Sequence, residues 1–314
     1  MAVTVVGSVA FDSLETPFGR RERILGGAAT HFSLSASMFT DVRVVGVVGH
    51  DFGTDEFERF HCKGIDTTDL ERVPGERSFF WKGRYDTDMQ VAETLETQLN
   101  VFAGFQPKLS EAARSSAMVF LANIQPDLQR GVREQCSGAL ITGLDSMNYW
   151  IESARESLLE TLAVVDVVML NDAEVRMLTG EANLKTAAAQ VRARGPRVLV
   201  IKQGSYGACM STDEGFFFVP GMPLDTVVDP TGAGDAFAGG FFGYLDSHTT
   251  DPFDEGCLRR AAVYGSVMAS FAIEDFGSER LERLTHAEVV DRCREFQRMT
   301  AFDHLAARER VLAT

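Results

Sequence analysis

The chain has 314 residues, of which 45% are hydrophobic and 24% charged, and its formal net charge is −15. This length can bury one large core with an inserted subdomain, whereas the acidity and the scattered Lys and Arg residues exclude a nucleic-acid-binding surface. Acidity of this size would also repel polyphosphates, so a nucleotide site would need local compensation from backbone amides, basic groups or a metal.

Strand and helix signals alternate along most of the chain. Short β-branched runs predict buried strands, and apolar residues spaced by three and four predict helices between them. This alternation predicts a mostly parallel sheet covered on both faces. The predicted strands are Ala2–Gly7, Arg43–Val48, Met118–Ala122, Leu140–Leu144, Val164–Leu170 and Val198–Lys202, and the predicted helices are Thr54–Lys63, Asp127–Cys136, Ile151–Leu162, Ala173–Thr179 and Leu184–Arg194.

Two segments depart from this alternation and predict a small β lid over about residues 10–24 and 76–104. The first is charged and turn-rich, and the second alternates polar with apolar or aromatic side chains, as half-exposed strands do. The later chain predicts a hairpin and two long helices, so one domain is expected over residues 1–300 with a helical tail over 301–314. The hairpin strands are Tyr206–Met210 and Gly215–Val219, and the helices are about Gly234–Asp246 and Phe253–Ala272.

A glycine-rich run, Asp229-Pro-Thr-Gly-Ala-Gly-Asp-Ala-Phe-Ala-Gly-Gly240, leads into one of these helices. Unpaired amides at a helix N-terminus bind anions, and small residues such as Gly232, Ala233 and Gly234 let a phosphate approach them closely. Asp235 is placed to take a proton from a hydroxyl that attacks a phosphoryl group. The alternative is that Asp235 only caps the helix.

The extended run resembles the C-terminal signature of the ribokinase-like carbohydrate kinases, the phosphofructokinase B group. There the matching Gly-Ala-Gly is the anion hole and the Asp is the catalytic base. The resemblance implies a three-layer, doubly wound α/β fold and transfer of the γ-phosphoryl group of ATP to a hydroxyl, such as a primary CH2OH group. No lysine follows a glycine, which excludes a Walker A loop, and Phe237 stands where a Rossmann fingerprint needs its third glycine.

Two landmarks near the N-terminus resemble the acceptor-binding positions of the family. The run Gly7-Ser-Val-Ala-Phe-Asp12 is expected to end the first strand, and its Asp12 matches an Asp that hydrogen-bonds sugar hydroxyls, although it could also be a turn residue. Gly26 and Gly27 match the Gly-Gly motif whose amides approach the sugar. His31 stands where the family usually has Asn, so it is either a substrate contact or a packed histidine.

Two further landmarks resemble the family's magnesium and nucleotide positions. Asn171 and Glu174 match an Asn-x-x-Glu element that helps to place hydrated Mg2+, whose ligands are oxygen atoms; a helix capping box is the alternative. Lys202, Gly204 and Gly207 match a turn that flanks the nucleotide, where the lysine position often holds Thr.

Other positions are expected to complete the nucleotide side. Gly265 belongs to a helix of small residues that resembles the wall of the adenine pocket, although helix packing explains the same composition. Thr231 is a nucleotide candidate, and a monovalent cation such as K+ is an open possibility beside it and Asp229. Asp145 and Asn148 follow a predicted strand and have no assigned role.

The acceptor stays open between a sugar, a sugar phosphate and a ribonucleoside, whose base could stack on Phe79-Phe80-Trp81. A nucleotide-binding sensor without catalysis is the alternative from another class. Lid edges could pair with a second copy, so a homodimer is one expectation. Five separated cysteines and the lack of a signal sequence or a run of about 18 apolar residues predict a cytoplasmic protein that binds no membrane.

Overall fold

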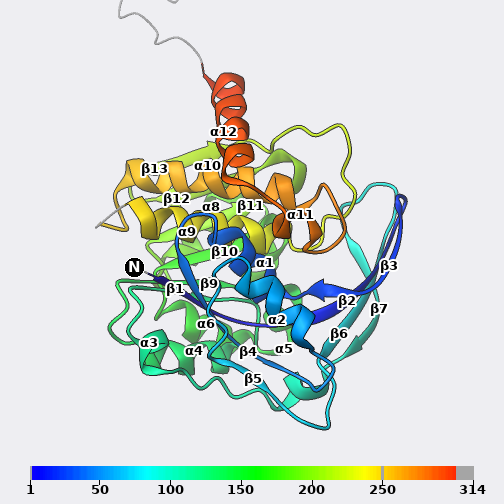
Figure 1. Cartoon of the computed structure of the whole chain (residues 1–314). Coiled ribbons are helices and arrows are strands. Elements are labelled where there is room, and N and C mark those ends of the chain that lie inside the picture. Colours follow the sequence, from blue (N-terminus) through cyan, green and yellow to red (C-terminus); the bar gives the residue numbers. More distant parts are fainter. Residues whose placement is uncertain (1, 249–250, 302–314) are drawn as a thin grey trace, which may run out of the picture.

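The computed structural model describes residues 2–248 and 251–301. Within these residues, nine strands form the main sheet in the order β13-β12-β11-β10-β9-β8-β1-β4-β5 (Figure 1). Strands β12 and β13 are antiparallel to their neighbours, and the other adjacent pairs are parallel. The strands are β1 (Ala2–Val6), β4 (Asp41–Val48), β5 (Leu70–Arg72), β8 (Met118–Leu121), β9 (Ile141–Asp145), β10 (Val167–Asn171), β11 (Val198–Lys202), β12 (Ala208–Thr212) and β13 (Gly215–Val219).

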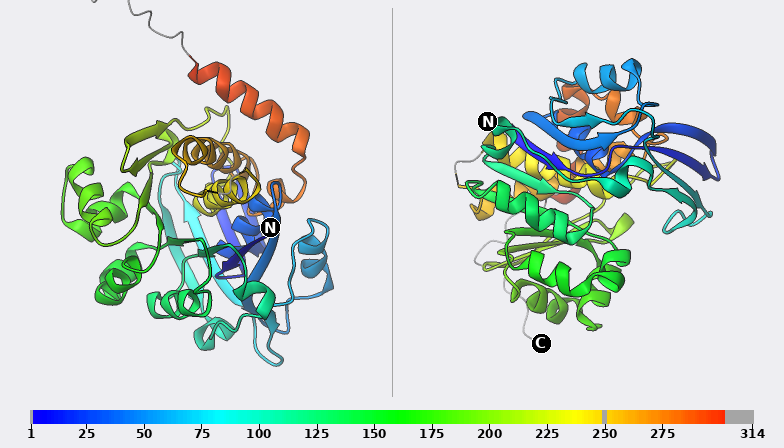
Figure 2. Two further views of the ribbon diagram at one scale, coloured as in Figure 1. Left: turned by 90° about the vertical axis from the view of Figure 1, so that its left-hand side faces the viewer. Right: turned by 90° about the horizontal axis from the view of Figure 1, so that it is seen from below.

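Helices cover both faces of this sheet, which gives the predicted three layers (Figure 2). Alternation along each strand divides the buried side chains between two cores, so that Val198 and Val200 of β11 face one core and Leu199 and Ile201 face the other. The first core is covered by α1 (Ala28–Ala36), α2 (Thr54–His61), α9 (Ala233–His248), α10 (Glu255–Ala272), α11 (Glu279–Glu282) and α12 (His286–Thr300), and the second by α3 (Glu111–Arg114), α4 (Pro126–Gln135), α5 (Asn148–Ser153), α6 (Arg155–Leu162), α7 (Asp172–Thr179) and α8 (Leu184–Arg192).

A second, four-stranded sheet has the order β3-β2-β6-β7 and projects from one side of the body (Figure 1). Its strands are β2 (Ala10–Thr16), β3 (Gly19–Gly26), β6 (Phe79–Tyr85) and β7 (Ala92–Gln98). Strand β2 pairs antiparallel with β3 and parallel with β6. The segments predicted to form the lid therefore meet in one sheet, although they are about 60 residues apart in the sequence.

Several sequence-based boundaries need correction. Asp12 does not end the first strand, because β1 stops at Val6 and the chain enters the second sheet at Ala10. The helix expected over Ile151–Leu162 is broken at Ala154, whose backbone leaves the helical region, so that α5 contacts α7 while α6 contacts α4. The C-terminal tail expected over 301–314 lies outside the described residues except for residue 301. Among the described residues, no helix is long and apolar enough to cross a membrane.

Candidate active site

The glycine-rich run forms a tight turn that leads into α9. Gly232 has a φ of 75°, a conformation that favours glycine, and α9 begins at the next residue. The buried Asp229 carboxylate fixes the entry to this turn, because it accepts hydrogen bonds from the backbone amides of Thr231 (2.9 Å) and Gly277 (2.8 Å). The first amides of a helix lack intrahelical partners, so the turn presents donors to an anion.

Asp235 lies in the first turn of α9, next to these amides. Its side chain is half-buried, and burial raises its pKa to about 7, with a further contribution from the Asp145 carboxylate. Lys202 opposes this shift. A carboxylate with a pKa near neutrality can accept a proton at physiological pH and release it again, which suits a general base.

Asp12 is buried on β2, where it meets the start of α1. Burial raises its pKa to about 7, the Asp229 carboxylate adds to the shift, and Asp235 contributes as well. A Cβ at Gly26 would lie 1.9 Å from Asp12 Oδ2, so the glycine is required for this approach. Gly27, with a φ of 95°, would clash with the backbone of Ser8 if it carried a Cβ. The structure therefore places Asp12, Gly26 and Gly27 next to one another.

His31 is buried on α1 and lies directly against the turn at Gly232. A Cβ at Gly232 would be 2.4 Å from the His31 imidazole ring. Only 1% of His31 is exposed, and neither ring nitrogen has a hydrogen-bond partner among the described residues. Burial lowers its pKa to about 4, so the ring is neutral at pH 7. His31 thus joins the Gly26-Gly27 segment to the anion-binding turn, a contact between residues 201 positions apart in the sequence.

Lys202, at the end of β11, reaches across the carboxyl edge of the sheet to Asp145 at the end of β9. Its Nζ lies 2.5 Å from Asp145 Oδ2, and 18% and 7% of the two side chains are exposed. The same Nζ would be 3.0 Å from a Cβ at Gly234. Burial works to lower the Lys202 pKa, but Asp145 and Glu174 outweigh it and the pKa is raised. Lys202 therefore stays charged between these carboxylates and the turn at Gly234.

Asn171 and Glu174 form a capping box at the start of α7. The Glu174 amide donates to Asn171 Oδ1, and the Asn171 amide donates to Glu174 Oε2, each at 2.8 Å. Burial raises the Glu174 pKa to about 7, with a contribution from Asp145. Capping engages one Glu174 oxygen, so the carboxylate retains a second oxygen for hydrated magnesium, which takes few protein ligands when it is bound to phosphates. Among the described residues, no group of three or more His, Cys, Asp or Glu side chains could hold a metal by itself.

The other nucleotide-side candidates divide into two groups. Gly204 and Gly207 follow β11 in left-handed conformations, with φ of 56° and 93°, so the Lys202–Gly207 turn does require its glycines. Gly265 is buried in α10, where a Cβ would lie 2.9 Å from the Phe237 carbonyl oxygen, so it allows α9 and α10 to pack closely. Asn148 begins α5, and its Oδ1 accepts a hydrogen bond from the Tyr149 amide.

Tyr85 was not among the residues singled out from the sequence. Its hydroxyl, on lid strand β6, accepts a hydrogen bond from Thr231 Oγ1 at 3.2 Å. Burial raises its pKa to about 12, and the Asp229 and Asp12 charges also raise it. The alternation of the Ser78–Tyr85 segment indicates a half-exposed strand, but it gives no sign of this contact with a residue 146 positions later.

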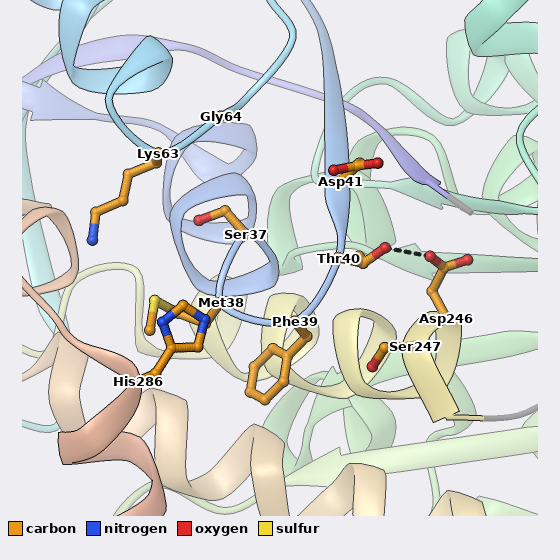
Figure 3. Close-up of a pocket in the computed structure, with 10 residues that line it drawn as sticks. All are labelled: Ser37, Met38, Phe39, Thr40, Asp41, Lys63, Gly64, Asp246, Ser247 and His286. Carbon is orange, nitrogen blue, oxygen red and sulfur yellow. Dashed lines mark hydrogen bonds between the residues drawn. The ribbon is translucent and has the colours of Figure 1, made fainter.

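A cavity of about 520 Å³ lies at the C-terminal ends of α1 and α9, whereas the site described above lies at their N-terminal ends. Figure 3 shows the residues that line it, among them Lys63, Asp246 and His286. Thr40 donates a hydrogen bond to Asp246 Oδ2 at 2.5 Å, and Lys63 donates one to the Leu284 carbonyl oxygen at 2.9 Å. The cavity is therefore separate from the site that contains Asp12 and Asp235.

Comparison with known proteins finds a family and a set of similar structures. The model of the pfkB family carbohydrate kinases matches residues 3–282. A cytidine kinase from Thermococcus kodakarensis is 30% identical over 263 residues, which cover 82% of this chain and 92% of that protein. The nucleoside kinase of Burkholderia thailandensis, solved in complex with inosine, has a TM-score of 0.76 at 19% identity and covers 95% of this chain and 98% of its own. A putative ribokinase II from E. coli, solved with ATP and Mg2+, has a TM-score of 0.77 at 17% identity, covering 93% and 99%.

Proposed function

This chain belongs to the pfkB family of carbohydrate kinases, and on that premise we propose that Asp235 is its general base, with the Gly232-Ala233-Gly234 turn as its anion hole. The chain is an ATP-dependent kinase that phosphorylates a hydroxyl of a sugar or of a sugar-containing small molecule. The observation that supports the assignment most directly is the contact of His31, which follows Gly26 and Gly27, with Gly232 of the turn before Asp235. In addition, the Asp235 charge contributes to the raised pKa of Asp12.

The proposed reaction uses each of these groups once. Asp12 and the Gly26-Gly27 amides hold the acceptor through its hydroxyls, and Asp235 takes the proton from the reacting hydroxyl. The acceptor oxygen bonds to the γ-phosphorus while the bond from that phosphorus to the departing oxygen of ADP breaks. Amides of the turn stabilise the charge on the transferred group. The neutral His31 ring packs against Gly232 of the turn.

The nucleotide is proposed to lie along the Gly204 and Gly207 turn, with Thr231 and Lys202 on its phosphate side and the Gly265 region of α10 beyond. Glu174 and Asn171 would hold magnesium through water, and the ion would neutralise charge on the phosphates. A monovalent cation beside Asp229 and Thr231 remains a proposal from the resemblance. Equal rates of phosphoryl transfer in potassium chloride and in tetramethylammonium chloride would contradict the proposed cation site.

A ribonucleoside is the acceptor that we propose. Trp81 on β6 is the register partner of Asp12 on β2, so the two side chains share one face of the lid sheet, and an indole there can stack on a base while Asp12 holds the ribose. The similarity to a protein named cytidine kinase supports this choice. A homodimer and a cytoplasmic location are further proposals, which sedimentation and cell fractionation would test.

We expect a panel of acceptors to separate these possibilities. With Mg-ATP, release of ADP should be fastest with ribonucleosides and give 5′-monophosphates, while free sugars and sugar phosphates should show a lower kcat/KM. Excess EDTA should abolish the reaction because the phosphates would lose their counter-ion. Faster turnover of a free sugar than of any nucleoside would contradict the proposed acceptor and identify the sugar as the acceptor. ATP binding without turnover of any acceptor would favour a sensor over an enzyme.

A further inference from the structure

The β6–β7 hairpin of the lid contacts the main body at both nucleotide-side turns. At one end, the Tyr85 hydroxyl accepts its hydrogen bond from Thr231, next to the anion-binding Gly232. In the loop that follows Tyr85, Gln90 Oε1 lies 3.4 Å from the position that a Cβ would take at Gly204. These two contacts hold the loop end of the hairpin against the turns at Thr231 and Gly204.

Strand β6 of this hairpin pairs with β2, whereas among the described residues the outer strand β7 has only β6 as a strand neighbour. Strand β7 is an edge strand whose side chains are almost all exposed or half-exposed, and 79% of Val91 near the tip is exposed. Segments with little buried apolar surface open locally at low free-energy cost. By contrast, the base of the lid is tied to the body by the Arg23–Asp51 ion pair at 3.0 Å and by Ser78, which donates two hydrogen bonds to Asp51.

We infer that Tyr85 is a positioning residue that latches the lid hairpin to the phosphate-binding turn through Thr231, and thereby couples closure over the acceptor to exclusion of water from the γ-phosphoryl group. The proposal rests on the kinase function proposed above. Closed, the hairpin keeps water from competing with the acceptor hydroxyl, since attack by water would yield ADP and inorganic phosphate. Open, it admits and releases both reactants.

The first test needs no acceptor. Hydrogen exchange of the amides in residues 79–98 is measured in the ligand-free wild type, in Tyr85→Phe and in Thr231→Val. One net hydrogen bond corresponds to roughly a two- to tenfold change in an opening equilibrium, so both variants should exchange faster by about that factor. The double variant should exchange no faster than either single one. Tyr149→Phe, which removes a hydroxyl from a 55% exposed tyrosine on α5, should leave the exchange unchanged.

The second test measures coupling in the same proteins. With Mg-ATP, Tyr85→Phe should raise acceptor-independent ATP hydrolysis relative to transfer and raise the KM for acceptor more than it lowers kcat. Thr231→Ser keeps the donor hydroxyl, so its ratio of ATP hydrolysis to transfer and its KM for acceptor should stay near the wild-type values. Thr231→Val should raise both. Wild-type exchange of the hairpin in Tyr85→Phe, or an equal effect of Tyr149→Phe, would overturn the latch. Failure to find an acceptor would contradict the proposed function and leave the exchange result standing.

Discussion

Replacing Asp235 with Asn should lower kcat by about 100- to 10,000-fold, which is the usual contribution of a positioned general base. The amide keeps the shape of the side chain but cannot take the proton of the attacking hydroxyl. Binding of ATP should change little, because the amides of Gly232 to Gly234 and the start of α9 are untouched. Turnover of the fastest acceptor, measured together with the Kd for ATP, tests both statements.

A helix-capping role is the alternative for Asp235, and the chain offers a matched control. Asp55 is an exposed carboxylate in the first turn of α2. If Asp235 only stabilised a helix N-terminus, Asp55→Asn and Asp235→Asn should lower stability by similar small amounts and leave kcat near wild type. Burial raises the Asp235 pKa to about 7, so removing its charge should leave the protein at least as stable above that pH. Near-normal turnover by the Asp235→Asn variant would contradict the assignment of Asp235 as the general base.

The pH dependence follows from the same carboxylate. With the Asp235 pKa near 7 in the ligand-free chain, kcat/KM should fall by about tenfold per pH unit below that value, as the base becomes protonated. Stability should change in the opposite direction. The folded chain binds protons to Asp12 and Asp235 more tightly than the unfolded chain does, so their contribution to stability falls as the pH rises from about 4 to about 7. A rate profile that stays flat from pH 5 to 8 would contradict the pKa assignment.

Sequence reasoning predicted those parts of the fold that depend on the residue pattern within one segment. Strand β11 has the predicted bounds, because an unbroken apolar run is what a parallel strand buried on both faces requires. No bounds were predicted for helix α1, because its Ala28–Ala36 segment is buried nearly all round and has no amphipathic period to detect. Asp12 was placed at the end of the wrong strand, since nothing local to Gly7 shows that the chain leaves one sheet for another.

The candidate site likewise contains features that lie within one short segment and contacts that join distant segments. Gly232 and Asp235, which we propose as part of the anion hole and as the base, lie within four residues, so a single motif contains both candidates. The contact of His31 with Gly232, the Tyr85 hydrogen bond with Thr231 and the Lys202 pair with Asp145 all join distant segments. Such contacts depend on the packing of whole elements, and no pattern within either partner predicts them.

The Lys202 pair gives the prediction with the largest expected effect on stability. Lys202→Met should lower the free energy of unfolding by about 3–5 kcal/mol at pH 8, the usual cost of leaving a buried charge without its partner. Asp145 would remain buried, and Glu174 and Asp235 would lose a cation that now opposes the rise in their pKa values. The loss should be smaller at pH 5, because Glu174 and Asp235, whose pKa values are raised to about 7, would then be protonated. Urea unfolding at the two pH values measures it.

Two further variants decide whether the loss comes from the pair or from the lysine alone. The double variant Lys202→Met with Asp145→Asn removes both charges, so it should regain much of the stability, since replacing a whole buried pair is often neutral. Lys185→Met, which removes an exposed lysine from α8, should cost no more than about 1 kcal/mol. If Lys202→Met cost as little as Lys185→Met, the 2.5 Å contact with Asp145 would have the energy of a solvated ion pair. The electrostatic support of the phosphate-binding turn would then have to come from its backbone amides and from magnesium.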